Sequence, residues 1–269
     1  MFLKKKHLLR LKRSRAIISR TNQTGLLLDR NERFVEFEKK INQKLLKEIS
    51  KIKLGLYPEL SHFYKLLSNW LKLPTDQIYI TEGVSGAIKS LIETIAIPGK
   101  SNIIFPHPTF ALYPVYCKMF NLKFKTIGYN SNYQLNWRKI FEKIDNKTSI
   151  VFLPNPNIPI EGLLNLKELE IIAKKCLKKK IILVLDEVYY PYGNISGIKL
   201  IKKYSNIFIM RSFSKSFGLA GIRLGYLISS KKNIEYVSKT RTGYETNSLS
   251  ITVATFFIKN YKYIKNYIK

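Results

Sequence analysis

The stretch Phe208-Ile-Met-Arg-Ser-Phe-Ser-Lys-Ser-Phe-Gly-Leu-Ala-Gly-Ile-Arg-Leu-Gly-Tyr226 places one lysine, Lys215, among hydroxyls and glycines just after an apolar run. The run itself, 206–210, is typical of a short buried strand. Arg223 carries a planar fork of donors that suits a phosphate. A lysine amine near another cation has a lowered pKa and can act as a nucleophile toward an aldehyde. The stretch therefore predicts a small-anion site beside a reactive amine.

The hydroxyls and glycines of this stretch support that interpretation. Ser212 and Ser214 are expected in a loop as hydroxyl donors, while Gly218, Gly221 and Gly225 permit close backbone approach or positive φ. The competing interpretation is a solvated Ser/Lys-rich loop, which is common after strands.

A second anion site is predicted near Ile78–Thr81, a brief strand followed by the turn 82–87 and an amphipathic helix to about Ile97. The order strand, glycine-containing turn, helix brings free N–H groups and the positive end of a helix dipole together. Many helices begin in this way, so the pattern alone is a weak signal.

A carboxylate follows the apolar run Ile181–Leu185, which is typical of a central parallel strand buried on both faces. Asp186 comes directly after it, at the end of a strand where α/β sheets bind ligands. An aspartate that only caps the next turn is the alternative.

Short strand-like runs alternate with helical segments across Ile78–Tyr226, which predicts an α/β layered fold with a mostly parallel sheet. Further strands are expected at 102–105, 123–129 and 150–153, and helices at 35–49, 61–73, 166–179 and 248–269.

Composition limits the possible partners of the chain. Its 269 residues include 47 Lys and Arg and 18 Asp and Glu, for a net charge of +29. A charge of this size would ordinarily indicate a protein that binds nucleic acid or an anionic membrane. No nucleic-acid-binding signature accompanies the charge. Cys117 and Cys176 form no metal-binding pattern, so no metal is expected. With no signal peptide recognised in Met1–Arg20 and no run of transmembrane length, a cytoplasmic protein is expected.

Ser212–Tyr226 resembles the Schiff-base lysine segment of the fold-type I aminotransferases that use pyridoxal 5′-phosphate, especially the histidinol-phosphate aminotransferase branch. The resemblance implies that Lys215 binds the cofactor covalently and that Asp186 pairs with its pyridine nitrogen. It further implies hydrogen bonding of Tyr189 to the ring oxygen and stacking of Phe110 on the ring. The phosphate is then expected to contact the turn and loop residues Gly83, Val84, Ser85, Ser212, Ser214 and Arg223.

Two further motifs carry the resemblance. Pro154–Gly162 is similar to the family's Asn-Pro-Asn-Asn-Pro-Thr-Gly turn, in which Asn157 matches one asparagine and Ile158 replaces the one that contacts the ring oxygen. Asn157 or a tyrosine is expected to substitute. Tyr57-Pro58 matches a Tyr-Pro whose tyrosine reaches the cofactor phosphate of the partner subunit, which implies a homodimer.

The resemblance implies a three-layer cofactor domain with an incomplete small domain, because family members continue past the end of this chain. The expected division is an N-terminal segment at 1–55, a pyridoxal-phosphate-binding large domain at 56–235 and the start of a C-terminal small domain at 236–269. Lys215, Asp186 and Tyr189 are the expected catalytic residues.

The predicted function is amino-group transfer between an amino acid or a histidinol-phosphate-like amine and a 2-oxo acid, in amino-acid biosynthesis. Three alternatives remain open: a decarboxylase of a phosphorylated amino acid, a non-catalytic protein of the same fold, and a basic nucleic-acid-binding protein.

Overall fold

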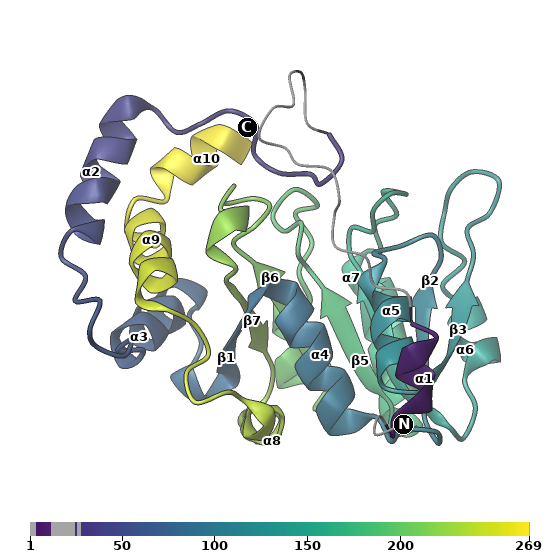
Figure 1. Ribbon diagram of the computed structural model, residues 1–269. Coiled ribbons are helices and arrows are strands. Elements are labelled where there is room, and N and C mark those ends of the chain that lie inside the picture. The colour runs from purple at the N-terminus through teal and green to yellow at the C-terminus, as the bar shows by residue number, and fades with distance from the viewer. Residues whose placement is uncertain (1–3, 12–24, 26–27, 269) are drawn as a thin grey trace.

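The computed structural model describes residues 4–11, 25 and 28–268. Among these residues the core is a seven-stranded sheet in the order β1-β7-β6-β5-β4-β2-β3 (Figure 1). Its strands are β1 (Ile78–Thr81), β2 (Asn102–Pro106), β3 (Lys123–Ile127), β4 (Thr148–Pro154), β5 (Ile182–Asp186), β6 (Ile207–Ser212) and β7 (Gly225–Ile228). All neighbouring pairs are parallel except those of β7, which runs antiparallel to both β1 and β6.

Successive side chains of each strand point to opposite faces of the sheet and pack into two separate hydrophobic cores, one on each face. On β5, Val184 belongs to the core beneath α4 (Gly83–Ile95) and α5 (Leu112–Met119). Leu183 and Leu185 belong to the core on the other face, with α7 (Leu166–Lys178). Figure 1 shows α4 and α5 in front of the sheet and α7 behind it. The layered α/β prediction is thus confirmed.

A group of helices lies beside the β1 edge of the sheet and extends the core on the α7 face (Figure 1). It consists of α2 (Lys39–Ile49), α3 (Ser61–Leu71), α9 (Ser248–Lys259) and α10 (Lys262–Ile268). The remaining α-helices are α1 (Lys6–Leu9), α6 (Lys139–Lys143) and α8 (Lys231–Val237), and 3-10 turns span Thr75–Gln77, Gly197–Lys202, Ala220–Ile222 and Ser238–Thr240.

Strand β7 is an element that the sequence patterns did not predict. The chain leaves β6, turns through Lys215 and returns antiparallel, so that Ser212 pairs with Gly225. A Cβ on Gly225 would lie 2.8–2.9 Å from backbone atoms of Gly83 and Arg211. This close approach requires a glycine, and it brings the loop of Lys215 beside the start of α4.

Several boundaries differ from the predicted ones. Helix α2 begins at Lys39 rather than Val35, and α5 begins at Leu112, after the turn at 106–111. Ser212, predicted in a loop, is the last residue of β6. Residues 12–24 and 26–27 lie outside the described residues, as does most of the N-terminal segment Met1–Arg20.

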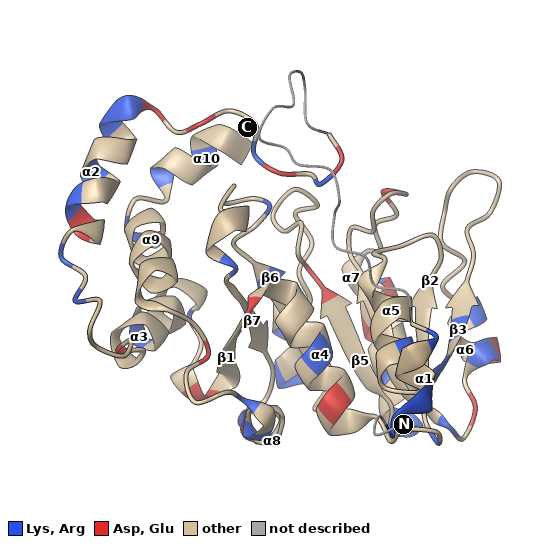
Figure 2. Ribbon diagram, in the orientation of Figure 1, with Lys and Arg blue, Asp and Glu red and all other residues tan. Residues whose placement is uncertain are grey.

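Basic residues are distributed over helices at both ends of the molecule (Figure 2). Within the described residues, no helix is long and apolar enough to cross a membrane. Cys117 and Cys176 are both buried and unpaired, and no group of three or more His, Cys, Asp or Glu in the described part of the chain could hold a metal ion.

Candidate active site

A cavity of roughly 760 Å³ lies at the carboxyl ends of β4, β5 and β6, with the loop 29–32 forming part of its wall. Ten of the twelve residues predicted for the site line it: Val84, Ser85, Phe110, Asn157, Asp186, Tyr189, Ser212, Ser214, Lys215 and Arg223. The other two are Gly83 and Tyr57. This position is the expected ligand site of a parallel α/β sheet.

Lys215 points into this cavity from the loop after β6 and is half-buried. Its Nζ donates to the backbone oxygens of Arg30 at 2.7 Å and Asn31 at 3.2 Å. Burial lowers the pKa of the amine, and the Arg223 cation lowers it further against the opposing effect of Glu32. A lower pKa increases the fraction of neutral amine, which is the nucleophilic form.

Asp186 faces the same cavity from the end of β5 and is 2% exposed. Its Oδ2 accepts a hydrogen bond of 2.5 Å from the Tyr113 hydroxyl, and its Oδ1 accepts one of 3.1 Å from the Val188 amide. Burial raises the pKa of Asp186 to about 6, although these two hydrogen bonds oppose the rise. The carboxylate is therefore anionic at neutral pH and suited to a cationic ring nitrogen.

Tyr189 lies half-buried three residues beyond Asp186 and reaches the same space. The Asn31 side-chain amide donates to its hydroxyl oxygen at 2.9 Å. Burial raises the pKa of Tyr189, so the hydroxyl keeps its proton. Because the oxygen accepts from Asn31, the O–H proton is available to donate into the cavity.

Hydrogen-bond donors converge at the junction of α4 and the Lys215 loop. The Arg223 Nη2 lies 3.3 Å from the Ser85 hydroxyl, and no side chain caps α4, whose amino end therefore presents backbone N–H groups. Gly83 has φ +62°, and a Cβ there would lie 3.0 Å from Arg223 Nη2. Ser212 Oγ accepts from the Ser214 amide at 3.0 Å. Such a cluster can bind a phosphate.

The side chain of Asn157 is occupied by protein contacts. Its Oδ1 accepts from the Thr109 hydroxyl at 2.6 Å, and its Nδ2 donates to Pro108 O at 3.0 Å and to the Tyr129 hydroxyl at 2.5 Å. These bonds hold the turn after β4 against the turn after β2. Ile158 lines the cavity with an alkyl side chain that offers no donor. Contact between Asn157 and a cofactor stays a prediction.

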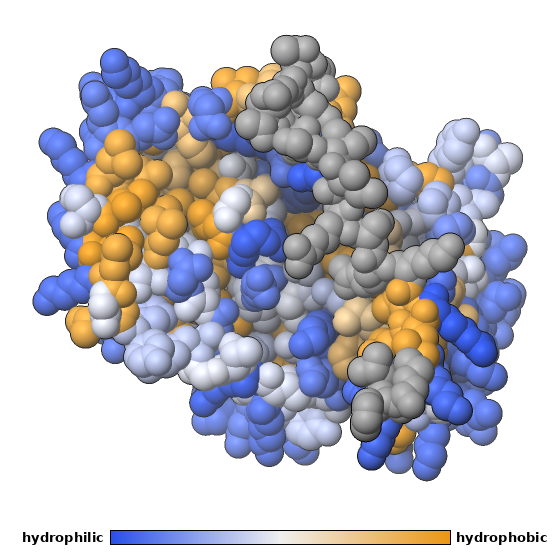
Figure 3. All heavy atoms as spheres, in the orientation of Figure 1, coloured by the Kyte–Doolittle hydropathy of each residue, from blue (hydrophilic) through white to orange (hydrophobic). Residues whose placement is uncertain are grey.

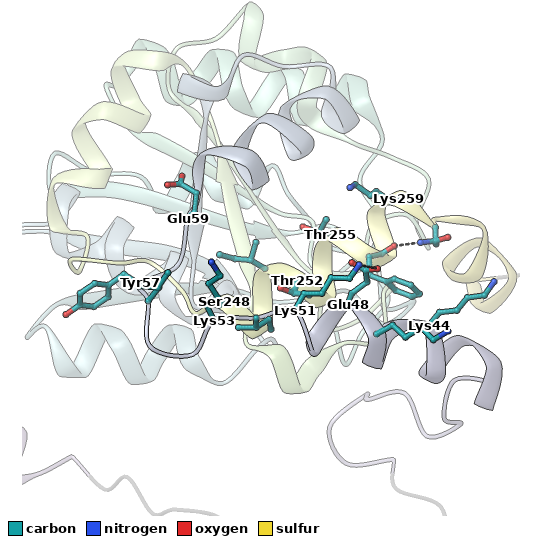
Figure 4. A pocket seen from close by; sticks show the side chains of 16 residues that line it. Lys44, Glu48, Lys51, Lys53, Tyr57, Glu59, Ser248, Thr252, Thr255 and Lys259 are labelled. Carbon is teal, nitrogen blue, oxygen red and sulfur yellow. Dashed lines mark hydrogen bonds and ion pairs between the residues drawn. The ribbon is translucent and has the colours of Figure 1, made fainter.

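Phe110 and Tyr57 lie in different surroundings. Phe110 lines the cavity, is 45% exposed and packs edge-on against Tyr113 with centroids 6.1 Å apart. Tyr57 is 78% exposed and lines a separate hollow between α2 and α9 (Figure 4). There its ring stacks on Tyr244 at 4.4 Å. A role for Tyr57 in a partner subunit's site stays a prediction.

Two residues outside the predicted set also contribute to the site. Tyr113 is fully buried, as expected of a packing residue in a helix, and its hydroxyl also donates a hydrogen bond to Asp186. Asn31 belongs to Asp29-Arg-Asn-Glu32, which resembles the family's Asp-x-Asn-Glu near the substrate entrance, although the end of a strand would give the same pattern. It accepts from Lys215 through its backbone oxygen and donates to Tyr189 through its side chain. The helical position of Tyr113 after Pro108-Thr-Phe carried no signal for this bond, because the contact depends on how α5 crosses the sheet.

Comparison with known proteins agrees with this geometry. The sequence model of the family "Aminotransferase class I and II" matches residues 27–266. The chain therefore belongs to the class I and II aminotransferases, whose expected cofactor is pyridoxal 5′-phosphate.

Several of the similar proteins are histidinol-phosphate aminotransferases. A histidinol-phosphate aminotransferase from Pyrococcus furiosus is 30% identical over 244 residues, which are 90% of this chain and 70% of that protein. The histidinol-phosphate aminotransferase of Clostridium acetobutylicum has a similar structure, with a TM-score of 0.75 and 26% identity over 86% of this chain and 68% of that one. That of Sinorhizobium meliloti, in complex with pyridoxal 5′-phosphate, shares the fold with a TM-score of 0.80 at 19% identity over 89% of this chain and 65% of that one.

The chain thus spans about two thirds of the length of these relatives. Its own residues nevertheless fit the cofactor. The cavity combines the Lys215 amine, whose pKa is lowered, the buried anionic carboxylate of Asp186, and a cluster of hydrogen-bond donors around Arg223 that can bind a phosphate. These are the groups that an aldehyde, a pyridine nitrogen and a phosphate require.

Proposed function

We propose that this chain transfers an amino group from a histidinol-phosphate-like amine or an amino acid to a 2-oxo acid with pyridoxal 5′-phosphate. One observation carries the proposal: Lys215 and Asp186 face one cavity from the ends of the adjacent strands β6 and β5. The same cavity also contains the donors Ser85 and Arg223, which are separated from Asp186 along the chain. Family membership and the resemblance to histidinol-phosphate aminotransferases support this assignment.

When bound, the cofactor supplies an aldehyde that combines with amines and a ring that withdraws electrons from the substrate α-carbon. Lys215 would hold the aldehyde end, and its free amine would act as the general base that removes the proton from the substrate α-carbon. Asp186 would keep the ring nitrogen cationic. Tyr189 would donate from its hydroxyl toward the ring oxygen, and Arg223 with Ser85, Ser212 and Ser214 would hold the phosphate.

The organisation of the whole protein is part of this proposal. We assign residues 56–235 to the cofactor-binding domain, 1–55 to an N-terminal segment at the substrate entrance and 236–269 to the beginning of a small domain. The α2–α9 hollow that contains Tyr57 supports association of two copies, since Tyr57 is exposed there and lies outside the cavity of its own chain. We also assign the enzyme to the cytoplasm and to amino-acid biosynthesis.

Product analysis tests the reaction. The chain, loaded with pyridoxal 5′-phosphate, is incubated with histidinol phosphate and a 2-oxo acid, with Lys215→Ala as the control. We expect the ketone formed from the donor and the amino acid derived from the acceptor, both absent with the control. Release of carbon dioxide from a phosphorylated amino acid without an oxo product would instead identify a decarboxylase.

A binding assay tests the nucleic-acid alternative. We expect no association with DNA or RNA at physiological salt, because the basic residues are spread over the fold rather than gathered in one site (Figure 2). Strongly salt-dependent association without turnover would favour the nucleic-acid-binding interpretation.

A further inference from the structure

A buried ion pair lies directly behind the candidate active site. The Arg211 guanidinium contacts Oε2 of Glu187 through Nε at 3.0 Å and Nη2 at 2.8 Å. The two side chains are only 8% and 1% exposed. We infer that this pair positions the ends of strands β5 and β6, which carry the cofactor-binding residues. The inference rests on the proposed function.

Strand alternation explains why the pair can act on the site without touching it. Asp186 is two residues after Val184 on β5, and Ser212 is two residues after Met210 on β6, so each points to the same face of the sheet as that neighbour. The side chains of Val184 and Met210 belong to the core beneath α4 and α5. Glu187 and Arg211 are each one residue away and therefore point to the opposite face. Each member of the ion pair is thus the chain neighbour of a cavity residue.

The pair is held from several directions on that face. Glu187 Oε1 accepts from the Gly197 amide at 2.6 Å, and its Oε2 accepts from the Ser196 hydroxyl at 2.9 Å. Arg211 Nη2 donates to the same hydroxyl oxygen at 2.7 Å, and the guanidinium lies 3.9 Å from the ring centroid of Tyr190. The network closes the turn 187–197, and Tyr189 lies within this turn.

Arg211 is also fixed from the third strand. It pairs across the sheet with Tyr226 of β7, and the nearby carboxylate of Glu187 raises the pKa of Arg211 despite its burial. The ends of β5 and β6, which line the cavity, are therefore joined by one charged, directional cluster, and β7 lies beside it. In the parallel register Asp186 of β5 lies opposite Met210 of β6, two residues before Ser212, and the cluster holds these two strand ends together.

Stability alone does not account for a charged pair in this place. Removal of one partner leaves an unpaired buried charge and is strongly destabilising, whereas removal of both charges is often neutral or stabilising. Neutral side chains can fill the space but cannot reproduce the two-point contact of a guanidinium fork with a carboxylate. Stability and cofactor binding are therefore separable in variants.

The test compares Glu187→Gln, Arg211→Met and the double variant. The glutamine keeps an oxygen acceptor for the Gly197 amide. We expect each single variant to lower the midpoint of denaturant unfolding and the double variant to return it close to the wild-type value. The dissociation constant for pyridoxal 5′-phosphate, measured by equilibrium titration, is expected to stay raised by about tenfold in the double variant.

Ile172→Ala is the matched control for lost stability, because Ile172 is fully buried on the same face of the sheet, on α7. It is expected to lower the midpoint and leave the dissociation constant unchanged. Wild-type affinity in the double variant would overturn the positioning role alone. Failure of the wild-type chain to bind pyridoxal 5′-phosphate through Lys215 would overturn the proposed function, and the inference with it.

Discussion

The Tyr113 hydroxyl donates a 2.5 Å hydrogen bond to Oδ2 of Asp186, and both side chains are buried. A carboxylate removed from water needs such partners, because an unpaired buried charge is very costly. The pKa of Asp186 nevertheless rises to about 6 because burial outweighs the hydrogen bonds. Tyr113 thus helps to keep Asp186 ionised at neutral pH.

Tyr113→Phe tests this relationship with little change in shape. Loss of the hydroxyl should raise the pKa of Asp186 further and cost about 1–3 kcal/mol of unfolding free energy at pH 8, where the carboxylate is charged. The carboxyl band in the infrared spectrum, recorded across pH, reports the pKa. Tyr116→Phe, on the same helix, is the control, and an unchanged Asp186 pKa in Tyr113→Phe would contradict the assignment.

The raised pKa of Asp186 also makes stability depend on pH. The folded protein holds the Asp186 proton up to about pH 6, whereas the unfolded chain releases it near the ordinary aspartate pKa of 3.8. Folding therefore takes up a proton between these values, and the contribution of Asp186 to stability decreases as pH rises through this window.

Asp186→Asn isolates that contribution, because asparagine does not titrate. The difference in unfolding free energy between wild type and variant should shift against the wild type by on the order of 3 kcal/mol between about pH 4 and 6. Denaturant titrations at several pH values measure it in the free protein. A difference that is constant over this window would show that the pKa of Asp186 is not raised.

Arg223→Gln tests the proposed phosphate contact. Loss of a charge-assisted hydrogen bond should weaken binding of pyridoxal 5′-phosphate by about tenfold or more. Binding of pyridoxal, which has no phosphate, should weaken much less, because only the effect of Arg223 on the pKa of Lys215 is lost. Arg138→Gln is the matched control, because Arg138 does not line the cavity and stacks on Trp137. Equal losses for the two ligands would place Arg223 away from the phosphate.

Gly221 and Gly225 give a matched pair of substitutions that tests the close backbone approach at the start of β7. A Cβ on Gly225 would meet the backbone of Gly83 and Arg211, whereas a Cβ on Gly221 would have nothing within 4 Å. Gly225→Ala should therefore lower the unfolding free energy by about 1–3 kcal/mol. Gly221→Ala should change it by less than about 0.5 kcal/mol. Similar effects of both substitutions in denaturant unfolding would argue against the close approach.

The layered fold could be predicted because its signals are local. The apolar run 181–185 and the turn at 82–87 each identify a strand or a helix start from adjacent residues. Strand β7 was missed because Gly225–Ile228 is short and its pairing is decided by a return of the chain through the Lys215 loop. An antiparallel partner of that kind depends on tertiary contacts rather than on periodicity.

In the candidate site, too, local signals could be recognised in the sequence, whereas tertiary contacts could not. Lys215, Asp186 and Arg223 could be proposed from charge and position at strand ends, whereas the partners of these groups are distant in sequence. Tyr113 is 73 residues from Asp186 along the chain. The exposure of apolar side chains on this side of the molecule (Figure 3), such as Leu46 and Leu56, was likewise not predicted, because it depends on what packs beside them.

Lys215 is the residue through which we propose that the chain holds pyridoxal 5′-phosphate, in the cavity bounded by the loop 29–32. The most direct measurement is the absorption spectrum of the chain titrated with the cofactor, followed by borohydride reduction and mass analysis of the peptide containing Lys215. We predict a saturable visible band, lost on reduction, with the cofactor mass on Lys215 and neither signal in Lys215→Ala. A wild-type spectrum identical to that of Lys215→Ala, with no mass added to Lys215, would contradict the account.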